Sequence, residues 1–413
     1  MTVSEELVWR GFANQTTLAS NKDLDATKRT FYWGVDPSAN SMQVGNLAAA
    51  MMVRVFIKHG HTPILLVGGA TGLIGDPDGK AQERDLKTPE LVAKNKAAIV
   101  DQYKTIFKGQ DFKVVDNYDW FKNMNYLDFL REVGKHVPLR QMVGRDFVQA
   151  RLGEGGAGIS YAEFSYSLIQ GYDFLHLFEK HGVTLQLSGA DQWGNSIAGV
   201  DLIRRKTGKE AHVWTAPLII NKATGKKFGK TEDGAVWLDP DQTSPYQFYQ
   251  FWLNVDDTGV EDYLKIYTEL GKDQIDDIMQ KFKQDKSSRL AQKTLAYEAT
   301  KLVHGEREAK AQSTQVLFKA DEYKKFTADD FKKLADLMPL HEVAESSDLI
   351  GLLVAGSLAS SNTEARRFLN GGAVYINGAQ SPVGKLALEK SDFIHGFATL
   401  RRGKNNQVLL KIK

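Results

Sequence analysis

The sequence of 413 residues contains no cysteine. Disulfide bonds, a thiol nucleophile and cysteine-ligated zinc or iron–sulfur sites are therefore excluded. Charge of one sign is also lacking, because 53 Lys and Arg stand against 51 Asp and Glu, a net charge of +2. No overall field thus points to nucleic acid or a membrane as the partner. No stretch approaches the roughly 18 apolar residues of a membrane span, and the acidic start resembles no secretory signal. We expect a cytoplasmic protein that does not bind membranes.

What is present is a regular alternation of strand and helix patterns over the first half of the chain. The apolar strand patterns and the helical patterns follow in turn, at 29–36 (strand), 45–59 (helix), 62–67 (strand), 89–108 (helix), 112–116 (strand), 162–181 (helix), 183–188 (strand), 191–207 (helix) and 212–220 (strand). This alternation predicts an α/β domain with a parallel sheet and crossover helices. The segment at about 110–158 departs from the pattern and is interpreted as an insertion.

The second half of the chain has a different character. From 260 to about 340 the pattern is charged and helical, without strands. The section 348–413 has turns at 370–372 and at Asn377-Gly378, with short β segments between and after them. Its last part, 385–413, holds seven Lys or Arg and two Asp or Glu, a local charge of +5. We therefore expect an α-helical domain followed by a small, basic α+β domain.

Two segments have a composition that suits phosphate. At 32–50 a strand, a turn and a helix follow each other, which places free N–H groups and a positive dipole end at the helix start. Gly45 would let a ligand approach the helix backbone closely. The loop Lys227-Phe228-Gly229-Lys230-Thr231 could close over a polyphosphate and neutralise its charge. Each segment also has an interpretation without a ligand. Such turns occur in any α/β protein, and a Lys-rich loop is often solvated surface.

Two further segments place polar residues in apolar surroundings. Tyr166, Gln170 and Asp173 are spaced i, i+4, i+7 on a predicted helix, so they lie within about 60° on its surface. They form either a structural polar network or a pocket for a ligand with hydroxyl and amino groups. The segment 189–195 follows a strand and opens a helix. Asp191 in it would bind a ribose diol or cap the helix.

Together these segments closely resemble the bacterial tyrosyl-tRNA synthetases, which are class I aminoacyl-tRNA synthetases. The resemblance covers nearly the whole chain and rests on the stretches 67–77, 163–166, 170–173, 191–195, 227–231 and 244–252. It implies three domains: a Rossmann-like catalytic domain (1–220, with a helical insertion at about 110–158), an α-helical domain that carries the KMSKS-type loop (221–345), and a small RNA-binding domain of the ribosomal-protein type (348–413).

The resemblance also implies roles for individual residues. Tyrosine would be bound by Tyr32, Thr71, Asp76, Tyr166, Gln170, Asp173 and Gln192, with its phenolic hydroxyl at Tyr32 and Asp173. ATP would be bound by Ser38, Gln43, Gly45, Asn46, Asp191 and Lys230. The catalytic residues would be Lys227, Lys230, Thr231, Lys80, Arg84, Gln43 and Asn46. No metal ligands are expected, because Mg²⁺ would arrive with ATP.

The implied reaction forms tyrosyl-adenylate from L-tyrosine and ATP and then transfers tyrosine to the 3′ end of tRNA(Tyr). A homodimer and no tightly bound cofactor are implied as well. The chain departs from the family at its HIGH motif, which reads Gln43-Val44-Gly45-Asn46 and contains no histidine. This change leaves one alternative open, a non-catalytic RNA-binding paralogue of the synthetase.

Overall fold

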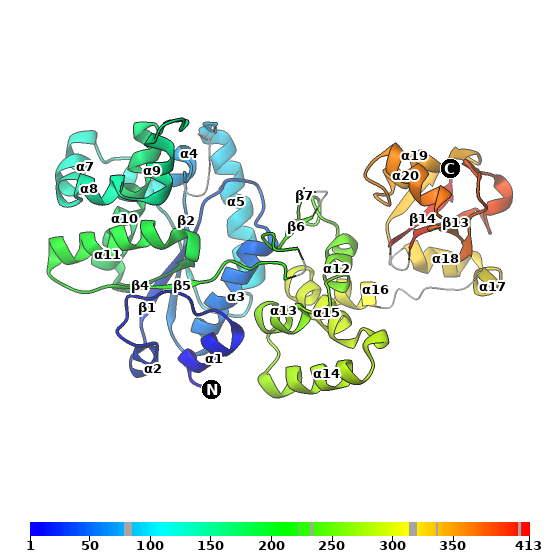
Figure 1. Cartoon of the computed structure of the whole chain (residues 1–413), viewed down its shortest axis with the longest axis horizontal. Coiled ribbons are helices and arrows are strands. Elements are labelled where there is room, and N and C mark those ends of the chain that lie inside the picture. Colours follow the sequence, from blue (N-terminus) through cyan, green and yellow to red (C-terminus); the bar gives the residue numbers. More distant parts are fainter. Residues whose placement is uncertain (78–84, 223, 232–233, 314–319, 336–337, 404–405) are drawn as a thin grey trace. The chain divides into compact units, whose positions relative to one another are not determined.

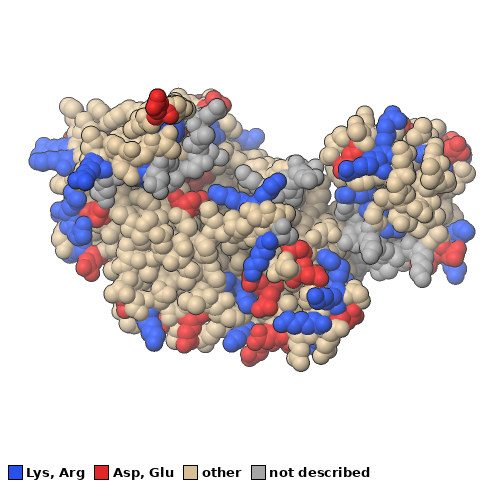
Figure 2. Space-filling model, in the orientation of Figure 1, with Lys and Arg blue, Asp and Glu red and all other residues tan. Residues whose placement is uncertain are grey.

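The computed structural model of the chain describes residues 1–77, 85–222, 224–231, 234–313, 320–335, 338–403 and 406–413 (Figure 1). Contacts divide the chain into two units. The first contains Met1–Lys230, Ala235–Asp239 and Asp256–Asp277, and the second contains Thr231–Gly234, Pro240–Val255 and Ile278–Lys413. On the face that Figure 2 shows, Lys and Arg are interspersed with Asp and Glu, as the nearly balanced composition leads one to expect.

The first unit is built on a five-stranded sheet with the order β3-β2-β1-β4-β5, and each neighbouring pair is parallel. The strands are β1 (Thr30–Val35), β2 (Thr62–Val67), β3 (Lys113–Asp116), β4 (Val183–Gly189) and β5 (His212–Ala216). Strands β2 and β4 are almost wholly buried, as their apolar runs require in a sheet covered on both faces. The predicted parallel α/β sheet is therefore confirmed.

Helices with clear end signals connect these strands. The long connections are α3 (Val44–Lys58), α5 (Pro89–Ile106), α10 (Tyr161–His181) and α11 (Trp193–Thr207). Ser160 caps α10 by accepting the N–H of Glu163, and the helix ends at Gly182 in the left-handed conformation. The shorter helices of this unit are α1 (Val3–Arg10), α2 (Asp23–Ala26), α4 (Thr71–Ile74) and α13 (Val260–Tyr267).

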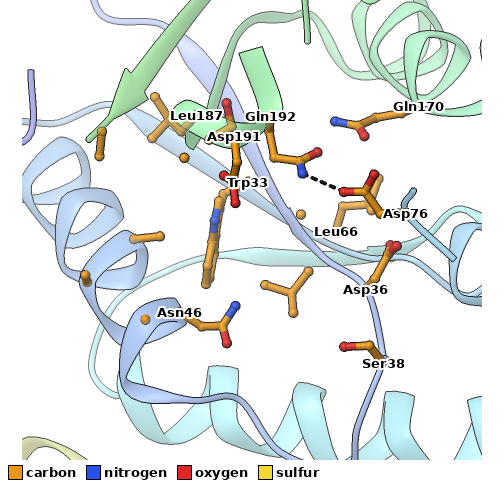
Figure 3. A pocket seen from close by; sticks show the side chains of 18 of the residues that line it. Trp33, Asp36, Ser38, Asn46, Leu66, Asp76, Gln170, Leu187, Asp191 and Gln192 are labelled. Atoms are coloured by element: carbon orange, nitrogen blue, oxygen red, sulfur yellow. Dashed lines mark hydrogen bonds between the residues drawn. The ribbon is translucent and has the colours of Figure 1, made fainter. Parts of the chain in front are cut away.

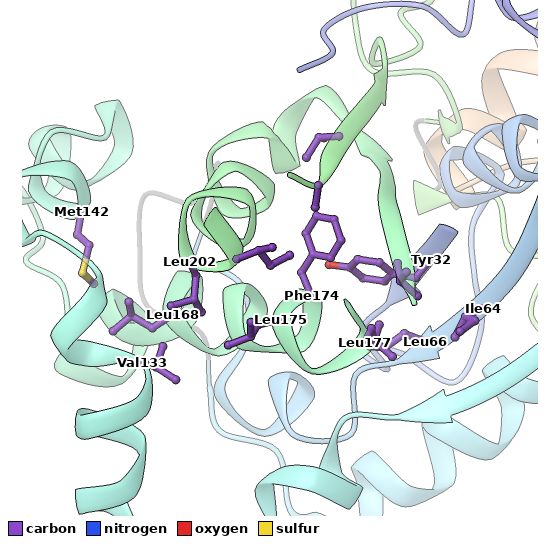
Figure 4. Packing of buried hydrophobic residues seen from close by; sticks show 14 residues of the cluster. Tyr32, Ile64, Leu66, Val133, Met142, Leu168, Phe174, Leu175, Leu177 and Leu202 are labelled. Atoms are coloured by element: carbon purple, nitrogen blue, oxygen red, sulfur yellow. The ribbon is translucent and has the colours of Figure 1, made fainter. Parts of the chain in front are cut away.

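The predicted insertion consists mainly of short helices, although β3 within it belongs to the sheet. These helices are α6 (Tyr118–Phe121), α7 (Tyr126–Glu132), α8 (Leu139–Val143) and α9 (Asp146–Leu152). A buried ion pair of 2.7 Å between Arg151 Nη1 and Glu163 Oε2 joins α9 to α10. The apolar core between α10 and the sheet extends into this region, where it includes Val133 and Met142 (Figure 4).

The second unit combines a helical part with a small sheet of order β11-β10-β13-β14-β8. Asn377 and Gly378 have φ values of 46° and 75°, as a tight β10–β11 hairpin requires. The sheet includes β8, which lies before the predicted domain start at 348. Its strands are β8 (Leu340–Val343), β10 (Val374–Ile376), β11 (Ala379–Gln380), β13 (Phe397–Arg402) and β14 (Asn406–Ile412).

Helices and short strands complete the description. The remaining helices are α12 (Pro245–Leu253), α14 (Lys272–Gln284), α15 (Leu290–His304), α16 (Glu306–Ser313), α17 (Ala320–Tyr323), α18 (Ala328–Ala335), α19 (Leu349–Ala355) and α20 (Asn362–Asn370). The remaining strands are β6 (Lys230–Thr231), β7 (Gly234–Ala235), β9 (Ser347–Asp348) and β12 (Ala387–Leu388). Among the described residues, no helix combines the length and the apolar composition needed to cross a membrane.

Glu6 on α1 is the centre of a cluster of charged side chains in the first unit, and its own side chain is almost fully buried. Its carboxylate pairs with Arg10 at 2.9 Å, with Lys58 at 2.9 Å and with His59 at 2.7 Å. Burial alone would raise the pKa of Glu6, but the hydrogen bonds from His59, Lys58 and Arg10 outweigh it and lower the pKa to about 2. Arg10 also donates to the backbone carbonyl of Thr268, just after α13. The cluster thus links α1, α3 and α13.

Glu6→Gln should lower the free energy of unfolding by about 3 kcal/mol at pH 7, because Arg10 loses its buried counter-charge. The pKa of Glu6 is lower in the folded state than its ordinary value of 4.5. The stabilisation should therefore be complete above about pH 5 and decrease as the pH falls below 4.5. Denaturant unfolding of both proteins between pH 7 and pH 3 measures this difference, and a gap independent of pH would contradict it. Asp101→Asn is the control, since that carboxylate is 72% exposed.

Candidate active site

A cavity of about 450 Å³ lies at the carboxyl ends of β1 and β4 (Figure 3). The chain order reverses between these two neighbouring strands, since β2 and β3 follow on one side of β1 and β5 follows on the other side of β4. Ligands of open parallel sheets bind at such a switch point. The predicted residues that line the cavity are Tyr32, Ser38, Gln43, Gly45, Asn46, Thr71, Asp76, Tyr166, Gln170, Asp173, Asp191, Gln192 and Lys227.

The remaining four predicted site residues are not among those that line the cavity. Lys80 and Arg84 lie outside the described residues. Lys230 and Thr231 form the short strand β6. The structure therefore brings together the residues predicted to bind tyrosine and most of those predicted to bind ATP.

Asp173 on α10 forms the deep end of the cavity and is only 2% exposed. Its carboxylate accepts hydrogen bonds from Asn117 Nδ2 at 3.0 Å and from Trp120 Nε1 at 2.9 Å. Burial is the largest influence and raises the pKa of Asp173 to about 8, although these two hydrogen bonds act in the opposite direction. Burial therefore favours the protonated form of this carboxyl group.

Several buried polar atoms of the cavity wall have no hydrogen-bond partner among the described residues. They are the hydroxyl of Tyr32, the amide oxygen of Gln170 and the amide oxygen of Gln186. The ring of Tyr32 packs against Phe174 with 5.3 Å between the centroids, which fixes its direction (Figure 4). Leaving such groups unpaired costs free energy. A ligand with its own hydrogen-bonding groups would recover that cost.

Three residues of the cavity network were not predicted from the sequence. Asp36 accepts hydrogen bonds from the hydroxyl of Thr71 at 2.6 Å and from that of Tyr166 at 2.7 Å. Asn117 and Trp120 hold Asp173. Asp36 and Asn117 each stand at the end of a predicted strand, so the rule that polar residues there face ligands would have found both. No pattern in the sequence around Trp120 indicates that it belongs to the site.

The start of α3 forms the opposite wall of the cavity. The N–H of Gln43 donates to Asn46 Oδ1 at 3.0 Å. This bond occupies the amide oxygen of Asn46 and leaves its Nδ2 group for the cavity. Figure 3 shows the indole of Trp33 in the wall between Asn46 and Asp191. The start of α3 therefore presents amide groups to the cavity.

The loop that carries Lys227 is joined to the start of α3 through the backbone. The N–H of Val44 donates to the carbonyl of Val236 at 3.1 Å, and the N–H of Val236 donates to the carbonyl of Gly229 at 3.0 Å. Gly229 has a φ of +88°, and a Cβ there would lie 3.3 Å from Val44 Cβ, so a side chain is doubly unfavourable. Phe228 stacks on Tyr263 of α13 at 4.2 Å. These contacts hold Lys227 at the cavity.

Asp173→Asn should remove a pH dependence of stability. The pKa of Asp173 is raised in the folded protein to about 8, so the folded state loses stability as the pH rises from about 4 towards 8. The loss amounts to about 1.4 kcal/mol per pH unit for a fully shifted group. In urea unfolding at pH 5.5, 6.5 and 7.5, the free energy of unfolding of the variant should increase relative to that of the wild type as the pH rises. A difference between the two proteins that is the same at each pH would contradict the raised pKa of Asp173. Asp119→Asn is the control, since that carboxylate is 67% exposed.

Comparison with known proteins assigns the family. Residues 25–319 match the model of the class I tRNA synthetases for tryptophan and tyrosine, and residues 330–410 match the SYY-like C-terminal domain of tyrosine–tRNA ligases. The tyrosine–tRNA ligase of Lactococcus lactis subsp. cremoris is 42% identical, over 99% of this chain and 100% of that protein. That of Neisseria meningitidis is 44% identical, over 99% of each.

A solved structure agrees with these sequences. The C-terminally truncated mitochondrial tyrosyl-tRNA synthetase of Aspergillus nidulans superimposes with a TM-score of 0.68 and 31% identity, covering 76% of this chain and 93% of that one. The fold of the first unit and the C-terminal domain thus have counterparts in one group of enzymes. The chain belongs to the tyrosyl-tRNA synthetases, within the class I tRNA synthetase family.

Proposed function

We propose that the chain is a tyrosine–tRNA ligase, which activates L-tyrosine with ATP and transfers it to the 3′ end of tRNA(Tyr). The observation that carries this proposal is the buried polar end of the cavity. The hydroxyl of Tyr32 and the carboxyl group of Asp173 line one closed region, and the first of them has no partner among the described residues. A phenolic hydroxyl would supply that partner, whereas phenylalanine would leave it unpaired.

The amino group of tyrosine would bind on the polar wall nearer the strand ends. Asp76, Tyr166 and Gln170 line this part, with Thr71 beside them. An ammonium ion donates three hydrogen bonds and carries a positive charge, which matches a carboxylate and an unpaired amide oxygen. Gln192 would lie near the tyrosine carbonyl.

ATP, with its Mg²⁺, would enter as substrate on the side of α3. We assign its contacts to Ser38, Gln43, Gly45, Asn46, Asp191 and Lys230, with Asp191 at the ribose. The tyrosine carboxylate is already ionised at pH 7 and needs no general base. It attacks the α-phosphorus, the bond to the β-phosphate oxygen breaks, and pyrophosphate leaves. Catalysis then consists of positioning and of charge stabilisation, which we assign to Lys227, Lys230, Thr231, Lys80, Arg84, Gln43 and Asn46.

The C-terminal domain would bind tRNA. Arg401 lies over the ring of Tyr375 at 3.9 Å, and Arg402 lies over the ring of Phe368 at 4.8 Å. Arginine and aromatic groups of this kind contact phosphates and bases of structured RNA.

The domain division at 220, 345 and 348 stays a prediction. A ligase that charges tRNA would act in the cytoplasm, where translation takes place.

The residues of 130–165, most of them in the helical insertion, would provide the interface of a homodimer. Large apolar side chains are exposed there, namely Leu139 on α8, Leu152 on α9 and Tyr161 at the start of α10. Such side chains on a protein surface favour association with a second chain.

Tyrosine-dependent exchange of labelled pyrophosphate into ATP tests the proposed function. Exchange should require tyrosine and should not occur with phenylalanine or tryptophan. Absence of exchange from a folded protein that still binds tRNA would instead establish the alternative, a non-catalytic RNA-binding paralogue.

Gln43→Ala should slow adenylate formation by roughly 10- to 150-fold, the effect of losing one hydrogen bond to a charged phosphate oxygen in the transition state. The tyrosine dissociation constant should stay nearly unchanged, because Gln43 lies on the α3 side of the cavity. Stopped-flow adenylation and tyrosine titration measure the two quantities. Gln43→His should keep most of the activity. Wild-type adenylation kinetics in Gln43→Ala would show that the lysines alone supply the stabilisation.

A further inference from the structure

A chain of hydrogen bonds runs from the helical insertion to the cavity. Arg145 Nη1 donates to Asn195 Oδ1 at 2.7 Å. Asn195 Nδ2 donates to Gln192 Oε1 at 3.1 Å. Gln192 Nε2 in turn donates to Asp76 Oδ2 at 2.6 Å, the last link of the chain, which Figure 3 shows. Asn195 is 1% exposed, so the middle of the chain is shielded from water.

Both ends of this chain impose the same direction. A guanidinium group has only donors, whereas an amide can donate from one side and accept on the other. Arg145 therefore requires Asn195 to present its oxygen, which turns the Asn195 amide nitrogen towards Gln192. Gln192 must then present its oxygen to Asn195 and its nitrogen to Asp76. A carboxylate has only acceptors, so Asp76 imposes the same direction from the inner end. Without Arg145, the oxygen of Asn195 would lose its donor, and the two amides would be held from the Asp76 end alone.

The position of Arg145 depends on a glycine in α11. A Cβ at Gly194 would lie 2.8 Å from Nη2 of Arg145 and 3.0 Å from its Nε. The guanidinium thus occupies the space that a side chain would fill. Gly194 is the second residue of α11, where glycine is a poorer helix former than alanine by about 1 kcal/mol. The space beside α11 therefore accommodates the arginine at a cost in helix propensity.

We propose that Arg145 is a positioning residue for tyrosine binding. Acting through Asn195 and Gln192, it fixes the position of the donor on Asp76 and so holds that carboxylate in the orientation that receives the substrate ammonium. The inference rests on the proposed function, because it takes the ligand of Asp76 to be the amino group of tyrosine. It assigns to the insertion a part in amino-acid binding, which is distinct from its proposed part in the homodimer.

The first test uses Arg145→Ala. Tyrosine affinity is measured by isothermal titration calorimetry, and the KM for ATP is measured by pyrophosphate exchange. The tyrosine dissociation constant should rise roughly 2- to 10-fold, the effect of one weakened hydrogen bond. The KM for ATP should change less than about 2-fold, since Asp191 and the start of α3 do not take part in the chain. Arg131→Ala, on the same insertion and 83% exposed, is the control and should change neither constant.

The second test separates positioning from a merely structural role. Gly194→Ala leaves the side chains of Asn195, Gln192 and Asp76 unchanged but displaces the guanidinium of Arg145. It should raise the tyrosine dissociation constant as Arg145→Ala does, while the better helix propensity of alanine offsets part of any loss in the thermal midpoint. An unchanged tyrosine affinity would overturn the inference, whatever the thermal midpoint.

The third test asks whether Arg145 acts through Gln192. In a Gln192→Ala background, Arg145→Ala should change the tyrosine dissociation constant less than about 2-fold, because the path to Asp76 is already broken. Full multiplication of the two effects would overturn the inference. The proposed function is tested separately by the wild type. A wild type that binds and exchanges tyrosine, with variants that do so equally well, overturns the positioning role alone, whereas a wild type without tyrosine binding overturns the function itself.

Discussion

The need to satisfy one buried amide determines how the cavity is assembled. The side chain of Asn117 has no exposed surface. It accepts the N–H of Ala70 after β2, and it donates to the hydroxyl of Thr71 and to the carboxylate of Asp173 on α10. Thr71 extends the network to Asp36 after β1. Because each of these groups would be costly to bury alone, the strand ends and the helix are held in one arrangement.

The wall of the cavity at the start of α3 is organised differently, by backbone rather than side-chain contacts. Pairing of Val44 with Val236, and of Val236 with Gly229, makes the start of α3 and the lysine loop parts of one local structure. Because main-chain hydrogen bonds hold these two segments together, their side chains remain available for a ligand. The wall of the cavity around Asp173 is thus held by a polar network, and the wall at the start of α3 by main-chain hydrogen bonds.

Much of this arrangement could be predicted from local sequence patterns. Apolar runs and helical spacing predicted the parallel sheet, and the spacing of Tyr166, Gln170 and Asp173 placed them on one face of α10. Contacts between distant segments could not be predicted in this way. Asp36 with Tyr166, and Asn117 with Asp173, are joined by the order of the strands, which no local periodicity encodes. Arg145 stands in a region without regular alternation, so only the folded chain brings it to Asn195.

The replacement of both HIGH histidines by Gln43 and Asn46 has a consequence for acid tolerance. An imidazole changes its charge and its hydrogen-bonding role close to neutral pH, whereas a carboxamide keeps the same donors and acceptor throughout. Among the residues that line the described cavity there is no histidine and no cysteine. The amide groups that line the cavity at the start of α3 therefore keep their charge and their hydrogen-bonding roles on mild acidification, a form of chemical constancy that an imidazole-based site does not have.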